Sequence, residues 1–185
     1  MLYRYLFILP FVKRLFFPIK TEPSLNVTSF IGKWNQVATS RSTTLFGTGP
    51  KYKNVTAYYN TSYNKELNQT VISVFNCGIS PKNIHKNISG YSYVNSPCLT
   101  KRKLHFDGVK VDGNYWIIKL GPIINNKYEY VVISGPLSSF FGTRFSLYVL
   151  ARNVEKYKKI YENEVRNWCK DQKFIFFWNK YISTV

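Results

Sequence analysis

Eight short runs of strand-forming residues lie between residues 32 and 151, and segments rich in Asn, Gly, Pro and Ser separate them. In residues 103–106, Leu104 and Phe106 alternate with Lys103 and His105, which is the pattern of a strand with one buried face. An aromatic content of 18% also favours sheet. Such a succession limits the chain to a sandwich or a barrel. Strands are expected at 32–39, 55–60, 71–77, 90–94, 103–106, 114–120, 128–134 and 145–151.

After residue 153 the apolar residues recur every three or four positions, at Val154, Tyr157, Ile160, Tyr161, Val165 and Trp168. This period predicts one amphipathic helix, about 154–169, with Asn153 as its N-cap. The helix would lie against the outside of the sheet. The tail at 174–178 is expected to form a further short strand or a docked extended segment.

Residues 1–20 combine basic residues with a short apolar run, as a signal peptide does, but Lys13 and Arg14 interrupt the run and no A-x-A cleavage site follows. The run is too short to span a bilayer comfortably. We therefore interpret residues 1–24 as a hydrophobic and basic targeting or anchoring segment. Residues 25–185 are expected to form one domain.

Three groups of residues, in this order, carry a resemblance to a known family. They are Gly32-Lys33-Trp34, the runs GNYWII at 113–118 and YEYVVISGP at 128–136, and Leu150-Ala151-Arg152. With them the chain resembles the lipocalin family, in particular bacterial lipocalins, apolipoprotein D and plant temperature-induced lipocalins. The resemblance implies an all-β fold, an eight-stranded antiparallel up-and-down β-barrel with one C-terminal α-helix packed outside. It also implies that Arg152 packs on Trp34 at the closed end of the barrel.

An eight-stranded barrel has room inside for one small ligand. Strand alternation predicts an apolar and aromatic lining with hydroxyl tips, which suits a small hydrophobic molecule such as a fatty acid, phospholipid or sterol. A tetrapyrrole or carotenoid would also fit, and the alternative is that these side chains fill a closed core. The predicted ligand-binding residues are Val55, Ala57, Tyr59, Leu104, Phe106, Ile117, Tyr148 and Leu150.

The loops after the first and seventh strands share the open rim of such a barrel, and both carry large apolar residues near Lys51, Lys53 and Arg144. Apolar side chains beside cations are what contact with an anionic membrane requires. The alternative is that they fold over the cavity as a lid. The predicted rim residues are Leu45, Phe46, Leu137, Phe140 and Phe141.

The chain carries 26 Lys and Arg against 9 Asp and Glu, a net charge of +17. This excess favours an anionic partner, either nucleic acid or a lipid surface. The basic residues are spread along the whole chain, which weakens the case for nucleic acid. A basic barrel that binds polyanions therefore stays only an alternative.

The three cysteines show no CxxC spacing, so we expect no metal site. In the barrel topology the third strand ends at the open rim, where the helix also finishes. We therefore predict a disulfide between Cys77 and Cys169, with Cys98 free. Five glycosylation sequons favour a secretory route, which predicts a secreted or extracytoplasmic protein in a secretory lumen or membrane-bound vacuole. They lie at Asn26, Asn54, Asn60, Asn68 and Asn87.

Neither His85 nor His105 has an acid or a nucleophile nearby in the expected fold, which argues against an enzyme. The sequence therefore predicts a cofactor-free binding and transport protein for a small hydrophobic ligand, with a lipocalin-fold enzyme as an alternative.

Overall fold

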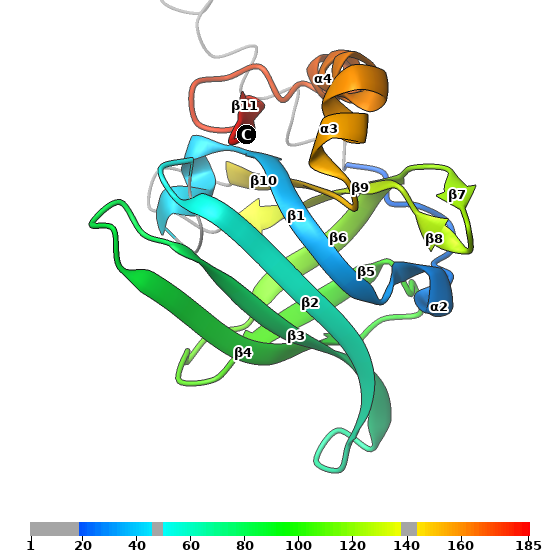
Figure 1. The fold of residues 1–185 in the computed structure, drawn as a ribbon. Coiled ribbons are helices and arrows are strands. Elements are labelled where there is room, and N and C mark those ends of the chain that lie inside the picture. Colours follow the sequence, from blue (N-terminus) through cyan, green and yellow to red (C-terminus); the bar gives the residue numbers. More distant parts are fainter. Residues whose placement is uncertain (1–18, 46–49, 138–143) are drawn as a thin grey trace, which may run out of the picture.

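The computed structural model describes residues 19–45, 50–137 and 144–185. Eight strands pair antiparallel with their neighbours in chain order, and the last closes onto the first (Figure 1). This closed barrel, with a C-terminal helix outside it, confirms the predicted fold class. The strands are β1 (Gly32–Thr39), β2 (Lys53–Asn64), β3 (Gln69–Ile79), β4 (His85–Val94), β5 (Lys101–Phe106), β6 (Gly113–Leu120), β9 (Tyr130–Leu137) and β10 (Arg144–Ala151).

Several strands extend beyond the predicted runs, among them β2 and β3. The two stay paired out to Asn64 and Gln69, so their hairpin projects past the barrel wall (Figure 1). Exposed polar residues such as Thr61 and Thr70 occur there, so the hydrophobic pattern does not predict this part of the strands. A second, smaller hairpin of β7 (Ile123–Ile124) and β8 (Lys127–Tyr128) connects β6 to β9.

The barrel wall separates two apolar clusters. Ile117, Ile133 and Leu150 belong to the inner cluster, whereas their chain neighbours Ile118 and Val149 belong to the outer one. Since successive side chains of a strand point to opposite faces, the continuous apolar runs of β6, β9 and β10 are buried on both faces.

The outer cluster exists because a helical segment covers that part of the wall. It runs through α3 (Val154–Lys156), a π-helical turn η2 (Tyr157–Tyr161) and α4 (Glu162–Asp171). The Asn153 side chain accepts a hydrogen bond of 2.8 Å from the Lys156 amide, which confirms the predicted N-cap. Tyr157 and Cys169 are buried against the barrel.

The tail differs from its prediction. Residues 174–178 form turns, and the additional strand is β11 (Ile182–Ser183), which pairs with Ala38 and Thr39 at the end of β1. The prediction of a strand or a docked extended segment at 174–178 is therefore wrong. Only Phe174 is buried there, and the four residues after it are exposed.

Residues 19–25 cross the closed end of the barrel. The Glu22 amide donates to the Ile117 carbonyl at 3.0 Å, the Thr100 hydroxyl donates to the Glu22 carbonyl, and Leu25 joins the inner cluster. Of the segment predicted for targeting, residues 1–18 lie outside the described residues, and the division at residue 24 stays a prediction. No helix in the described ranges is both long enough and apolar enough to cross a bilayer.

Arg152 seals the closed end. Its guanidinium lies 3.7 Å from the centre of the Trp34 ring, the contact that the resemblance implies. It also donates hydrogen bonds of 2.7 to 3.3 Å to five main-chain carbonyls, those of Ser29, Phe30, Ile31, Lys33 and Tyr128.

The end of α2 and Gly32 surround this guanidinium. The short helix α2 (Val27–Phe30) ends there, and the Phe30 carbonyl also accepts a 2.8 Å bond from the Trp34 indole. Gly32 has a φ of +109°, and a Cβ at this position would lie 3.2 Å from Nη1 of Arg152. A residue with a side chain would therefore be strained and would also crowd the guanidinium.

Replacing Arg152 by Lys should lower the free energy of unfolding by about 2 to 3 kcal/mol, because one ammonium group cannot reproduce the fork of hydrogen bonds or the stacking on Trp34. Urea unfolding followed by tryptophan fluorescence measures the change. The matched control is Arg166→Lys in the exposed α4 pair with Glu162, where a loss below about 0.5 kcal/mol is expected. Equal losses in the two variants would contradict the assigned role of Arg152.

Candidate functional site

The barrel interior is the candidate site, and it collects most of the predicted ligand-binding residues. Ala57, Tyr59, Ile117 and Leu150 are buried members of the inner cluster. The partly buried Leu104, Phe106 and Tyr148 pack against them. Val55 is buried outside this cluster, beside Gly78 of β3. That these side chains bind a ligand stays a prediction.

Depth inside the barrel follows strand direction. Trp34 and Phe30, fully buried, close the bottom, where their rings lie 5.6 Å apart. Phe106 is the last residue of β5, and Tyr148 pairs with Thr39 at the end of β1, so both lie toward the open end. Their partial exposure leaves apolar and aromatic surface accessible from that side.

Two tyrosine hydroxyls meet within the inner cluster. The Tyr115 hydroxyl donates to the Tyr59 hydroxyl at 2.9 Å. Burial raises the pKa of Tyr59 to about 12 and the pKa of Tyr115 well above its usual value. Burial also raises the pKa of the nearby Tyr148. All three therefore stay neutral near pH 7 and present hydroxyl groups rather than charges.

Arg102 is an interior residue that the sequence prediction missed. It lies on β5 on the same face as Leu104 and Phe106, and only 5% of it is exposed. Its Nε donates to the Ser92 hydroxyl at 2.8 Å, and Nη2 donates to the Ser92 carbonyl at 2.7 Å. A third, long bond of 3.5 Å reaches the Leu99 carbonyl.

This buried guanidinium has no ion-pair partner among the carboxylates of the described residues. Burial lowers the pKa of Arg102, but an arginine stays protonated at neutral pH. The interior therefore holds a positive charge within an aromatic lining. The alternation of residues 103–106 would have revealed it had the strand been extended to Lys101, where β5 begins.

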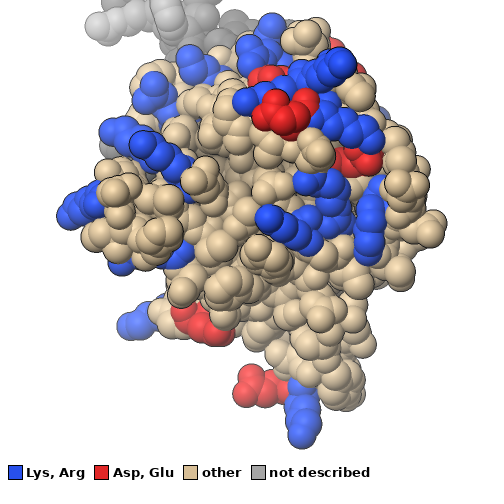
Figure 2. Space-filling model, viewed as in Figure 1, with Lys and Arg blue, Asp and Glu red and all other residues tan. Residues whose placement is uncertain are grey.

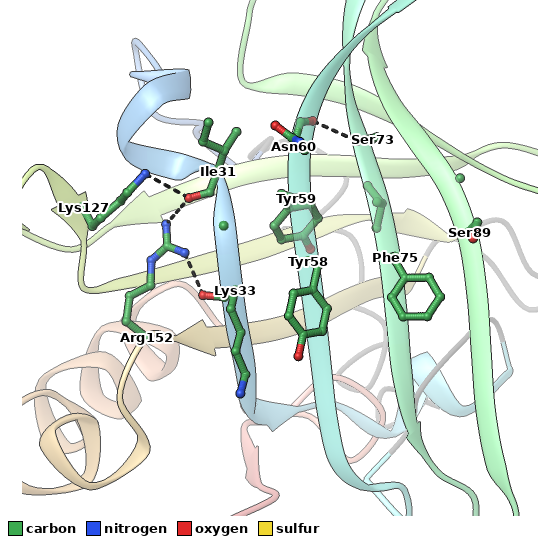
Figure 3. Close-up of a pocket in the computed structure, with 13 residues that line it drawn as sticks. Ile31, Lys33, Tyr58, Tyr59, Asn60, Ser73, Phe75, Ser89, Lys127 and Arg152 are labelled. Atoms are coloured by element: carbon green, nitrogen blue, oxygen red, sulfur yellow. Dashed lines mark hydrogen bonds between the residues drawn. The ribbon is translucent and has the colours of Figure 1, made fainter.

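A hollow lies outside the barrel, near the closed end (Figure 3). This closed-end groove of about 780 Å³ is lined by Lys33, Tyr58, Phe75 and Arg152 among others. The Tyr58 and Phe75 rings are 6.3 Å apart and about two-fifths exposed, at 43% and 41%. Asn60, a predicted glycosylation site, is part of the lining, so a glycan there would cover the groove.

The predicted rim residues are only partly within the described structure. Phe46, Phe140 and Phe141 lie outside it. Leu45 ends the 3₁₀ turn η1 (Arg41–Leu45), and Leu137 ends β9 half-buried. Membrane contact by these residues stays a prediction.

The predicted disulfide between Cys77 and Cys169 is not formed, because all three cysteines are free thiols in the described part of the chain. Cys169 points from α4 into the outer cluster, to which β3 contributes no residue. Cys77 lies on β3 and forms a 2.9 Å hydrogen bond with the Thr56 hydroxyl instead. The helix covers a different part of the wall from the one that carries Cys77.

The expectation that His105 has no acid nearby is wrong. Its Nδ1 lies 2.9 Å from a carboxylate oxygen of Asp112, which the turn between β5 and β6 brings back toward β5. Tyr93 donates a 2.6 Å bond to the same carboxylate, and this bond raises the tyrosine pKa to about 12. A hydroxyl held neutral in this way is a poor nucleophile.

Two further predictions concern the surface. No group of three potential metal ligands occurs in the described ranges. The acceptor asparagines at 26, 54, 60, 68 and 87 are all exposed, as glycosylation requires, although their modification stays a prediction.

No model of a known protein family matches the sequence, and no curated protein matches it significantly. Among solved structures the chain is similar to lobster apocrustacyanin A1, with 16% identity and a TM-score of 0.59 over 86% of this chain and 79% of that one. It is also similar to H1 crustacyanin from the lobster Homarus americanus, with 16% identity and a TM-score of 0.58 over 89% and 81%. At this identity the likeness shows the fold alone, which is the lipocalin fold. Membership of the lipocalin family, and of any branch of it, stays a prediction.

The three cysteines are predicted to differ in the pH at which their thiols react. The Thr100 and Thr21 hydroxyls, 3.2 and 3.5 Å from Sγ, lower the pKa of Cys98 to about 7, whereas burial raises the pKa of Cys169 to about 12. Because the thiolate is the reactive form, iodoacetamide should label Cys98 increasingly as the pH rises through about 7 and should not label Cys169 until the protein unfolds.

Mass mapping identifies the labelled sites, and thiol titration in denaturant should give three thiols for protein purified without reductant. A count of one free thiol, with Cys77 and Cys169 in a single linked peptide, would show that the predicted disulfide does form. Labelling of Cys98 that does not change with pH would contradict the role of the two threonines.

Proposed function

We propose that this protein binds and transports a small, fatty-acid-like ligand in the barrel interior. The observation that carries the proposal is the buried Arg102 beside an aromatic lining, without a carboxylate partner in the described structure. A buried charge is costly unless an opposite charge accompanies it. The acidic head group of a ligand would supply that charge.

The described partners of Arg102, all neutral, do not use all of its hydrogen-bond donors. A guanidinium has five N–H donors, and the described residues accept from Arg102 at three places, two of them on Ser92. A carboxylate can accept two of these donors side by side, which makes the pair both strong and specific in geometry. The neutral hydroxyl of Tyr115, a residue that pairs with Arg102 across the β5–β6 ladder, adds a further polar group.

The position of Arg102 sets the orientation of the ligand. It lies near the beginning of β5, next to the loop that carries Leu99 at the closed end. The partly exposed Leu104, Phe106 and Tyr148 lie farther toward the mouth. We therefore place the acidic head group deep in the barrel and the hydrocarbon tail along these side chains. A fatty acid fits this division better than a sterol, which has no charged group.

The setting we propose is extracytoplasmic, in a secretory lumen, a membrane-bound vacuole or the medium. The exposure of all five acceptor asparagines supports it. We further propose that the open rim docks on anionic membranes, where the protein would load or release its ligand. A catalytic role is not part of the proposal, since the Tyr93, His105 and Asp112 cluster lies on the outer wall and its hydroxyl is held neutral.

The head-group pairing predicts a preference that can be measured with two probes of equal chain length, oleate and oleyl alcohol. The wild-type protein should bind oleate more tightly, in a fluorescent fatty-acid displacement assay. Arg102→Gln should weaken oleate binding by about tenfold or more, because a charge-assisted pair is lost, and should leave the alcohol nearly unchanged. Arg166→Gln on the exposed face of α4 is the matched control, with no expected change.

Two results would contradict the proposal. If Arg102→Gln, shown to be folded by its near-ultraviolet circular dichroism, binds oleate like the wild type, Arg102 does not hold the head group. If neither probe binds the wild type, the interior is a packed core.

A further inference from the structure

Four consecutive apolar residues, Ile175 to Trp178, form an exposed turn near the end of the chain. We call residues 175–178 the aromatic turn. Their exposed fractions are 52% for Ile175, 40% for Phe176, 55% for Phe177 and 46% for Trp178. The rings of Phe177 and Trp178 meet edge to face at 5.0 Å, so they present one continuous aromatic surface.

The aromatic turn is held in this exposed position by its flanks. Phe174, just before it, is 1% exposed within the outer cluster, and Asn179, just after it, is 6% exposed. The Asn179 side chain accepts a 3.0 Å bond from the Phe176 main-chain amide, and the Asn179 main-chain amide donates to the Phe176 carbonyl at 3.0 Å. A turn anchored on both sides keeps its apolar side chains at the surface.

The aromatic turn lies at the open rim. The Ser42 amide donates to the Trp178 carbonyl at 2.7 Å, and the Arg41 guanidinium lies 4.5 Å from the Phe177 ring centre. Both partners belong to η1, which directly follows β1 at the mouth. The strand β11 that follows the turn extends the sheet beside the same end of β1 (Figure 1).

The rim around the aromatic turn is cationic. Four of the described segments at this rim, 41–45, 50–53, 79–85 and 172–185, contain no Asp or Glu, whereas the turn between β5 and β6, at the same end of the barrel, carries Asp107 and Asp112. Lysine and arginine line the upper left of Figure 2, over this part of the rim, and an acidic patch appears lower on the same side. A groove of about 700 Å³, lined by Lys51 and Lys53 together with β11, opens in the same region. The basic residues of these segments are Arg41, Lys51, Lys53, Lys82, Lys173 and Lys180.

We infer that the aromatic turn inserts into the interfacial layer of an anionic lipid bilayer, while the surrounding lysine and arginine residues contact the lipid head groups. Tryptophan and phenylalanine favour this layer, and basic side chains are attracted to its negative potential. A second copy of the chain is a poorer occupant, because two such rims would bring like charges together. The inference deepens the proposed docking of the open rim by naming the residues that enter the bilayer. It rests on the proposed ligand binding for its purpose, since it turns the mouth of the barrel toward the source of the ligand.

Vesicle co-sedimentation tests the inference, using phosphatidylcholine vesicles with and without phosphatidylserine. The wild-type protein should bind the vesicles that contain phosphatidylserine, and the double variant Phe177→Ser and Trp178→Ser should bind them at least about tenfold more weakly. Tyr58→Ser with Phe75→Ser is the matched control, because it removes a pair of rings with similar exposure from the outer wall. This control should bind like the wild type.

A spectroscopic readout follows Trp178 directly. The wild-type emission should shift to the blue on addition of these vesicles, and the shift should disappear with Trp178→Phe, since Trp34 is buried and Trp116 and Trp168 lie partly buried on β6 and α4. The variant keeps an apolar ring at the turn, so its vesicle binding should persist.

Oleate binding in solution separates this inference from the proposed function. The Phe177→Ser, Trp178→Ser variant should retain it, because the aromatic turn lies outside the barrel interior. The inference would be overturned if the double variant bound vesicles as tightly as the wild type. It would also be overturned if the wild type did not bind vesicles at all. Concentration-dependent self-association that only this variant loses would assign the turn to a second copy and overturn it as well.

Discussion

The guanidinium of Arg152 holds together three parts of the chain that would otherwise leave the barrel open at one end. It joins the end of β10 to the start of β1 and to the carbonyls at the end of α2. Removal from water lowers its pKa to about 10, so it keeps its charge at neutral pH. The ring of Trp34 on one side and main-chain carbonyls on the other replace the lost solvation. These contacts seal this end of the barrel.

The C-terminal helix covers the outer face of the wall on one side only. The outer face of β1, β6, β9 and β10 is covered by the C-terminal helix, and these strands carry apolar residues on both faces. The opposite wall, made of β2 to β5, faces solvent with residues such as Tyr58, Phe75 and His105, and three of its asparagines are predicted glycosylation sites. Under the proposed function a ligand would enter the interior from the mouth, where the rim beside the aromatic turn is basic and aromatic.

The sequence was informative wherever a property depended on local period. The order of the strands, the N-cap at Asn153 and the shared face of Leu104 and Phe106 all follow from repeats of two or of 3.6 residues. It was uninformative where two distant segments must meet. The contact of Asp112 with His105 depends on how one turn folds back, and the separation of Cys77 from Cys169 depends on which part of the wall the helix covers.

The aromatic run near the C-terminus illustrates a third limit. A period-based interpretation of residues 174–178 expects burial, because five apolar residues in succession are typical of a buried strand. In the structure only Phe174 is buried, and two hydrogen bonds between Phe176 and Asn179, one of them to the Asn179 side chain, bend the chain into a turn. Apolar composition predicts removal from water, but it does not specify whether the protein interior or a lipid surface provides it.

Arg152 and Arg102 both lie toward the closed end of this barrel, but their hydrogen bonding differs. Arg152 donates to five main-chain carbonyls and stacks on an indole, so its bonding capacity is used by the fold itself. Arg102 is more deeply buried, yet its described acceptors are one side chain and two carbonyls. Replacing a buried charge by an apolar residue usually costs a fold little when no partner depends on it. For this reason we propose that the guanidinium beside Tyr115, on the same face of β5 as Leu104, serves as a site for an acid rather than as a structural contact.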